Sequence, residues 1–288
     1  METSQLTIQF LNGLSYGLLL FLLAAGLSLI FGLMGTINMA HGSFFMLGAY
    51  LGYAITTATG DFLLAVIGAS AAMAMVGVLL ERCFFRKLYK MELNQVLLSF
   101  GFTYIFMDIA RGLWGGTPRS LATPGLLEGS VVILGGAFPL YRLALVVIGL
   151  GVALLLWLFL ERTRTGIVIR AGVDDKQMVE ALGTNIRSYF TAIFALGAFL
   201  AAFGGVIGAP IIGVYPGLDF EILVLALVIV VVGGLGTLKG AFWGSILIGL
   251  TESFAKIIFP DYSIMTIYIT MIIVLLFKPA GLFGKGGP

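Results

Sequence analysis

Two apolar stretches near the start of the sequence decide the fold class. They are IQFLNGLSYGLLLFLLAAGLSLIFGLM (residues 8–34) and HGSFFMLGAYLGYAITTA (residues 41–58). No Asp, Glu, Lys or Arg occurs between Glu2 and Asp61, and only His41 adds an imidazole. A helix needs about 20 apolar residues to cross the hydrocarbon core of a bilayer. Each stretch is therefore predicted to be a membrane-spanning helix, with a break at residues 34–38.

The composition of the whole chain agrees with this prediction. Of the 288 residues, 60% are hydrophobic and 10% are charged, and the mean hydropathy is +1.10. A soluble domain carries about 25% charged residues. These values exclude a soluble enzyme, a disordered chain and a nucleic-acid-binding domain. We predict an all-α, polytopic membrane protein in which residues 1–288 form one domain in the lipid bilayer, with no nucleic acid partner.

Charged residues mark the ends of the remaining spans. Nine crossings fit the pattern best, with eight or ten as alternatives. The charge-free stretches that predict them are 8–34, 41–58, 62–80, 93–107, 143–160, 188–218, 222–238, 240–251 and 262–277, and each span is allowed to extend past a terminal charge. Glycines repeat along the first and sixth spans, and small residues let helices approach closely in lipid.

The basic residues predict the orientation of the chain. Cytoplasmic loops of membrane proteins carry an excess of Lys and Arg. With the N-terminus outside and the C-terminus in the cytoplasm, 12 of the 16 basic residues fall inside. Those inside are Arg82, Arg86, Lys87, Lys90, Arg162, Arg164, Arg170, Lys176, Arg187, Lys239, Lys278 and Lys285. Those outside are Arg111, Arg119, Arg142 and Lys256.

Two hydrophilic stretches lie between spans. The outer one, residues 112–138, is rich in Gly and Pro and is expected to be an ordered loop or a short re-entrant element. The inner one, residues 161–187, contains five basic and four acidic residues and no Pro. Its Asp-Asp pair is typical of a helix start and Gly183 of a helix end. A short cytoplasmic helix is predicted over about 174–182.

The side chains needed for catalysis or metal binding are missing from the sequence. It has one His, one Cys and no phosphate-binding Gly-x-x-x-x-Gly-Lys-Ser/Thr motif. We therefore expect no enzyme activity and no cofactor on this chain, and any ATP and Mg would bind partner subunits. The spans also lack an Asp/Glu/His relay for ion coupling. A transport path through these spans would be lined mostly by apolar, glycine and neutral polar groups, which suits a small, largely apolar or zwitterionic solute.

Several stretches resemble one family of transporters. They are residues 26–50, 81–86, 163–171 with 180–183, 232–241 and 278–284. In this order they are similar to the branched-chain amino-acid ABC importer permeases of the LivH type. That family has an Asn-Phe-Ala-His-Gly core between two apolar runs, and here Met39 replaces the Phe. The resemblance covers nearly the whole chain.

The resemblance implies an ATP-driven importer in a bacterial or archaeal cytoplasmic (inner) membrane. A periplasmic or extracellular solute-binding protein delivers the solute, a homologous second permease completes the pore, and two cytoplasmic ATPase subunits drive transport. The expected solutes are branched-chain or other apolar amino acids. Relatives import urea, short amides or aromatic acids, and some amino-acid members have a basic residue where residues 223–232 are uncharged here. The resemblance therefore does not decide which of these solutes is transported.

Three groups of site residues follow from the local patterns and the resemblance. The resemblance implies that the inner helix and its flanks couple the chain to the ATPase. The coupling residues predicted there are Asp174, Asp175, Glu180, Ala181, Leu182, Gly183, Asn185 and Arg187. The break after the first span and the glycine-rich turn predict the translocation-path residues Asn38, His41, Gly42, Ser43, Gly234, Gly236 and Thr237. The residues expected to contact the binding protein are Tyr215, Asp219 and Glu221.

Each assignment has a plainer alternative. For residues 174–187 the alternative is a plain solvated loop. For Asn38 and His41 it is that they satisfy local backbone groups, and for Tyr215, Asp219 and Glu221 that they are ordinary loop residues. The alternative function is a channel or facilitator for a small neutral solute that acts alone.

Overall fold

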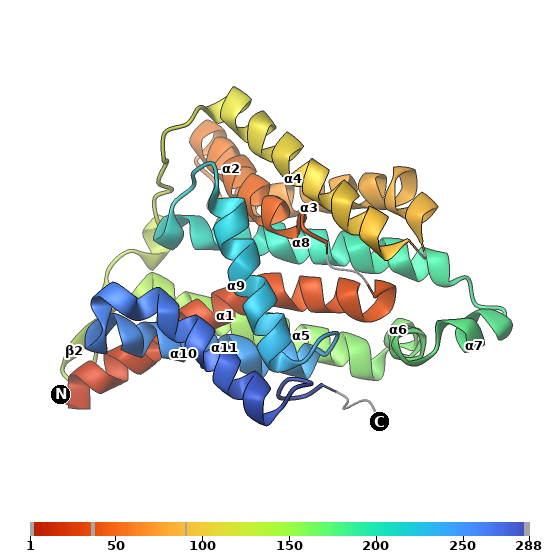
Figure 1. Ribbon diagram of the computed structural model, residues 1–288. Helices are drawn as coiled ribbons and strands as arrows, with labels where there is room; N and C mark the ends of the chain where they lie inside the picture. The colour runs from red at the N-terminus through yellow and green to blue at the C-terminus, as the bar shows by residue number, and fades with distance from the viewer. Residues whose placement is uncertain (1–2, 36–37, 90, 285–288) are drawn as a thin grey trace.

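The fold is a bundle of α-helices, seen in a computed structural model that describes residues 3–35, 38–89 and 91–284 (Figure 1). Its α-helices are α1 (Thr3–Met34), α2 (His41–Thr59), α3 (Phe62–Cys83), α4 (Glu92–Trp114), α5 (Leu140–Arg162), α6 (Arg164–Asp174), α7 (Lys176–Ala181), α8 (Ile186–Ile212), α9 (Leu218–Gly233), α10 (Leu238–Ile258) and α11 (Ser263–Phe277). Short 3-10 turns occur at η1 (Phe85–Leu88), η2 (Gly125–Leu127) and η3 (Pro260–Tyr262). The prediction of an all-α, polytopic membrane protein is confirmed.

Nine of these helices overlap the nine expected spans, although several begin or end at other residues. Seven segments are long and apolar enough to cross a membrane: α1, α3, α4, α5, α8, α10 and residues 260–277. The other two, α2 and α9, are inclined to α1 and α8 (Figure 1). With 16 residues, α9 is about 24 Å long, at a rise of about 1.5 Å per residue. The number of complete crossings and the side of each terminus stay predictions.

The central helix of the bundle is α1. Residues 18–30 are buried almost without interruption, and α1 packs against α5, α8, α9 and α10. A helix that is apolar all round belongs in a core. The expected small-residue contacts are present: a Cβ at Gly17 would lie 2.6 Å from the carbonyl oxygen of Ser245 on α10. Backbones this close leave no room for a larger residue.

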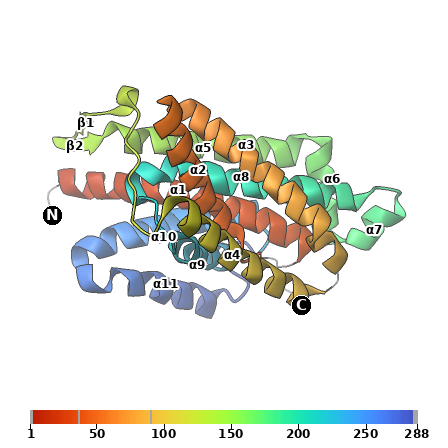
Figure 2. The ribbon, with the colours of Figure 1, turned by 90° about the horizontal axis from the view of Figure 1, so that it is seen from above.

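Two structures mark the opposite ends of the bundle (Figures 1 and 2). At one end, the start of α1 lies beside an antiparallel hairpin of β1 (Ser130–Ile133) and β2 (Gly136–Pro139). The turn between them uses positive φ at Leu134 (47°) and Gly135 (85°), as a two-residue hairpin requires. At the other end, α6 and α7 connect α5 to α8. We call these the hairpin end and the α7 end.

Residues 112–138 were expected to form an ordered loop or a short re-entrant element. The hairpin lies at the end of this stretch, which therefore has more regular structure than predicted. Eight of the basic residues assigned to the inside belong to elements around the α7 end: the end of α3, η1, the end of α5, α6, α7 and the start of α8. They are Arg82, Arg86, Lys87, Arg162, Arg164, Arg170, Lys176 and Arg187. Lys90, Lys285 and the break residues 36 and 37 lie outside the described residues.

Candidate functional site: a polar cavity at the hairpin end and an exposed turn at the α7 end

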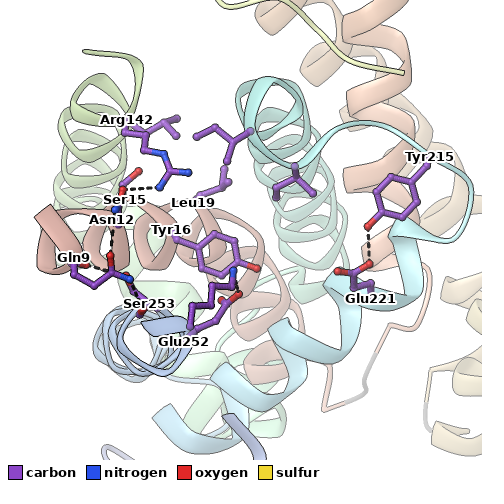
Figure 3. A pocket seen from close by; sticks show the side chains of 15 residues that line it. Gln9, Asn12, Ser15, Tyr16, Leu19, Arg142, Tyr215, Glu221, Glu252 and Ser253 are labelled. Carbon is purple, nitrogen blue, oxygen red and sulfur yellow. Dashed lines mark hydrogen bonds and ion pairs between the residues drawn. The ribbon is translucent and has the colours of Figure 1, made fainter. Parts of the chain in front are cut away.

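A polar cavity of about 410 Å³ opens at the hairpin end of the bundle (Figure 3). Its lining comes from the first half of α1, the start of α5, the segment from α8 to α9 and the end of α10. The polar lining residues are Gln9, Asn12, Ser15, Tyr16, Arg142, Tyr215, Glu221, Glu252, Ser253 and Lys256. In a chain with few charges, this is a concentration of charged side chains within one space.

The positive charge that enters the cavity from α5 is Arg142. It is half-buried, and its Nη1 donates a hydrogen bond of 2.6 Å to Oδ1 of Asn12 on α1. Within the described residues, no carboxylate lies within ion-pair distance of Arg142. The guanidinium is therefore held by a neutral amide and keeps its charge uncompensated by a direct partner.

Two carboxylates border the same cavity. Oε1 of Glu252 pairs with Nζ of Lys256 at 2.6 Å, four residues along α10. Oε2 of Glu252 is buried and has no hydrogen-bond partner among the described residues. Glu221 accepts a hydrogen bond of 2.6 Å from the hydroxyl of Tyr215. Figure 3 shows Glu252 beside Tyr16, with the Tyr215–Glu221 pair on another side of the cavity.

The Tyr215 hydroxyl is held in its protonated form. Burial, followed by the hydrogen bond to Glu221, raises the pKa of Tyr215 to about 12. Two of the three predicted binding-protein contacts, Tyr215 and Glu221, therefore act as a pair at the rim of this cavity. The third, Asp219, is fully buried and does not reach the surface of this chain, because the first turn of α9 faces α2.

The α7 end carries a protruding helix and turn. Asp175 adopts extended dihedrals and its Oδ1 accepts hydrogen bonds from the backbone N–H of Gln177 (2.9 Å) and Met178 (3.0 Å). It caps α7, so the predicted helix over 174–182 is corrected to Lys176–Ala181, with Asp174 as the last residue of α6. Gly183, at φ +82°, ends the turn as predicted.

The predicted coupling residues are all exposed at this end. They are Asp174, Asp175, Glu180, Ala181, Leu182, Gly183, Asn185 and Arg187. The apolar side chains of Met178 and Leu182 are also open, at 58% and 77% exposure. This segment presents both charges and apolar surface to a partner.

A second cavity, of about 500 Å³, lies beneath the exposed turn. Glu180 and Arg187 border it, together with Met34 at the end of α1. Lys176 extends from α7 into it, with Nζ 5.7 Å from the centre of the Phe190 ring, and burial lowers the pKa of Lys176. Movement of α7 would therefore reach the end of the central helix directly.

The predicted path residues lie in helix junctions and not in either cavity. Oδ1 of Asn38 accepts a hydrogen bond of 3.1 Å from the N–H of Ala40, and Nε2 of His41 lies 3.1 Å from the carbonyl oxygen of Leu23. Asn38 thus contacts a backbone group within its own loop, and His41 contacts one across helices, on α1. Ser43 Oγ donates to Oδ2 of Asp219 at 3.2 Å.

The glycine-rich turn before α10 is a second such junction. Thr237 caps α10 by accepting a hydrogen bond from the N–H of Gly240, and its carbonyl oxygen accepts one of 3.1 Å from Ser28 on α1. A Cβ at Gly236 would lie 2.8 Å from Cα of Gly32. Gly234 is packed as closely against Gly284. The turn therefore joins the second half of α1 to α10.

Comparison with known proteins places the chain in a family. Residues 9–275 match the family described as branched-chain amino acid transport system / permease component. The chain belongs to this family. The permease is 32% identical to the high-affinity branched-chain amino acid transport system permease protein BraD of Pseudomonas aeruginosa, over 96% of this chain and 95% of that protein. It is 28% identical to LivH of Escherichia coli (strain K12), over the same shares.

One solved structure is also similar to the permease. PsaBC from Streptococcus pneumoniae in complex with Fab aligns with a TM-score of 0.49 at 14% identity, covering 92% of this chain and 89% of that one.

The residues of the hairpin-end cavity were missed by the sequence analysis, except Tyr215 and Glu221. One signal was available: Gln9, Asn12 and Tyr16 are spaced by three and four residues, which places them on one face of a helix. A polar stripe on the central helix of a permease needs polar partners, and Arg142 and Glu252 supply them. The sequence did not indicate which later helices would do so.

Proposed function

We propose that the permease is the membrane-spanning subunit of an ATP-driven importer for branched-chain or other apolar amino acids, located in a bacterial or archaeal cytoplasmic (inner) membrane. The match of residues 9–275 to the branched-chain amino acid permease family carries this proposal. The names of BraD and LivH describe high-affinity branched-chain amino acid transport, and the chain aligns with both over nearly its full length.

The energy for transport comes from partner subunits in this proposal. The sequence has no phosphate-binding loop, so ATP and Mg bind two cytoplasmic ATPase subunits. Residues 174–187, the coupling segment, dock in a groove of an ATPase. Its exposed Leu182 supplies apolar contact area, and Glu180 and Arg187 fix the register.

The other partners meet the permease on its remaining surfaces. A solute-binding protein docks at the hairpin end, near Tyr215 and Glu221, and a homologous second permease completes the pore. The path assignment for Asn38, His41, Gly42, Ser43, Gly234, Gly236 and Thr237 stays a proposal. These residues pack where helices meet, which supports a role as the junctions at which helices move when the translocation path opens and closes.

Transport by reconstituted vesicles tests the proposed function. The permease is reconstituted with a second permease and ATPase subunits that co-purify with it, a solute-binding protein is added outside, and uptake of radiolabelled L-leucine is measured with ATP inside. Uptake should require ATP and every partner. The matched control is the same complex loaded with a non-hydrolysable ATP analogue.

Two results would contradict the proposal. Leucine uptake by the permease alone would identify a facilitator that acts without ATPases. Uptake of urea or acetamide without uptake of leucine would identify the substrate class of other relatives and leave the importer assignment in place.

A further inference from the structure

We propose that the hairpin-end cavity binds the transported amino acid itself, with Arg142 taking the α-carboxylate and Glu221 and Glu252 taking the α-ammonium group. This inference rests on the proposed function and adds a substrate site within the permease. It makes the permease, and not the binding protein alone, selective for zwitterions.

The charges of the cavity match those of a zwitterion. Arg142 and Lys256 bring two positive charges, and Glu221 and Glu252 bring two negative ones. A net neutral set favours a solute whose own charges cancel. The described residues contain no group of three His, Cys, Asp or Glu side chains that could hold a metal ion.

Arg142 is the side chain best placed to take a carboxylate. Its single hydrogen bond among the described residues joins Nη1 to the neutral side chain of Asn12, so the remaining guanidinium donors are free for a ligand. A guanidinium presents its donors as a fork that matches a carboxylate in two parallel hydrogen bonds. Asn12 fixes the direction of that fork from α1.

The carboxylates provide the complementary half of the site. Oε2 of Glu252 is buried without a partner among the described residues, and a buried acceptor left unpaired is costly. Glu221 has Tyr215 as its hydrogen-bond donor and no basic partner in the described residues. An ammonium group offers three donors, enough to satisfy free oxygens of this kind.

The size and apolar part of the cavity suit an aliphatic amino acid. Its volume of about 410 Å³ falls within the range of about 300–1,000 Å³ common for small-molecule sites. Leu19, Leu145, Ile211 and Ile212 complete the lining between the charged groups. A branched side chain would bury its methyl groups against these four residues.

Ligand binding to the assembled transporter in nanodiscs, without the binding protein, tests the site. Radiolabelled L-leucine is the probe. The competitors are leucinamide, which lacks the carboxylate, and 4-methylpentanoate, which lacks the ammonium group. The variants are Arg142→Gln and Glu221→Gln, and Arg111→Gln is the matched control because Arg111 is exposed on α4.

Wild-type complex should bind leucine saturably and prefer it to both competitors. Arg142→Gln should weaken leucine binding by about ten- to a hundredfold, the range for a lost charge-assisted hydrogen bond. It should leave leucinamide binding nearly unchanged, so that the preference for leucine disappears. Glu221→Gln should instead reduce the preference of leucine over 4-methylpentanoate. Arg111→Gln should leave all affinities unchanged.

Three outcomes overturn the inference. One is leucine affinity within twofold of wild type in both Arg142→Gln and Glu221→Gln. Another is equal weakening of leucine and leucinamide in Arg142→Gln, which indicates a structural effect alone. The third is wild-type complex that transports leucine yet shows no saturable binding. In that last case the proposed function stands and the site is wrong, whereas absence of leucine transport altogether would reject the function first.

Discussion

The hydroxyl of Ser43 on α2 donates a 3.2 Å hydrogen bond to Oδ2 of Asp219 in the first turn of α9. Both side chains are fully buried. The bond joins the two helices that are inclined to the rest of the bundle. A Cβ at the neighbouring Gly42 would lie 2.1 Å from the carbonyl oxygen of Asp219, so the two backbones meet here without space for a methyl group.

Gly42→Ala should destabilise the permease by forcing α2 and α9 apart. Overpacking a tight core costs about 1–3 kcal/mol, which a fluorescence-detected thermal unfolding assay in detergent would record as a lower Tm. The control is Gly101→Ala on α4, where a Cβ meets nothing within 4 Å and where Ala is the better helix former. An unchanged Tm in Gly42→Ala would show that the junction is not tight.

Gly183→Val should uncouple ATP hydrolysis from transport. Gly183 has φ +82° and a Cβ there would meet nothing within 4 Å, so the substitution adds backbone strain of about 1–2 kcal/mol without a clash. The turn after α7 would change its conformation while membrane insertion stays normal. Substrate-stimulated ATPase activity and leucine uptake should both fall.

Gly183→Asn is the matched control for this prediction. Asn tolerates the left-handed region far better than a β-branched residue, so this variant should keep most of the coupling. Full ATPase stimulation and full uptake in Gly183→Val would remove the coupling role assigned to residues 174–187.

The spans were predictable because charges are expensive inside a membrane, and the same rule explains where the prediction failed. The charge-free stretches used for the prediction ended at residue 218 and began again at 222, on either side of Asp219 and Glu221. In the structure, Gly213 at φ +83° ends α8, and α9 begins at Leu218 with Asp219 buried against Ser43. A charge paired across helices is not visible in the local sequence.

The candidate sites divide in the same way. The coupling segment was predictable because a helix cap and a terminal glycine are local signals, although Asp175 and not Asp174 caps α7. The hairpin-end cavity was not predictable, because its charged side chains come from separate helices that meet only when the helices pack. Arg142 lies 130 positions from its partner Asn12. Nor did Leu134 predict a hairpin, since leucine rarely adopts the positive φ found there.

Alkaline pH should weaken the contact between Tyr215 and Glu221. The pKa of Tyr215 is raised to about 12, against about 10 for an unperturbed tyrosine. The folded state therefore keeps the phenol proton where the unfolded state loses it. The resulting stability is fully present below about pH 10 and is lost as the pH rises from about 10 to 12.

Comparison of wild type with Tyr215→Phe isolates this effect from the other tyrosines. Wild type should have the higher Tm near neutral pH, because it keeps the hydrogen bond to Glu221. The difference between the two proteins should shrink as the pH rises above 10. A difference that is constant up to pH 12 would show that Tyr215 titrates alike in both states.

Glu81→Gln should destabilise the α7 end more than any exposed charge substitution. The Glu81 side chain is fully buried and accepts hydrogen bonds from Arg86 at 3.3 Å, from Thr191 at 2.6 Å and from Tyr89. It thereby ties α3 and the η1 segment to α8, beside the coupling segment. Breaking one partner of a buried ion pair costs about 3–5 kcal/mol, and the partial exposure of Arg86 places this case near the lower limit.

A double variant separates the cost of the unpaired charge from the loss of the carboxylate. In Glu81→Gln, the guanidinium of Arg86 keeps its charge and its hydrogen bond to Thr191 but has no carboxylate partner. Glu81→Gln with Arg86→Gln should therefore be more stable than Glu81→Gln alone. Asp108→Asn is the exposed control, since Asp108 is 75% exposed and 4.0 Å from Arg111, and pairs of that kind contribute about 0–1 kcal/mol. If the double variant unfolds at a lower temperature than Glu81→Gln, the instability comes from lost packing around Thr191 and Tyr89 and not from a stranded charge.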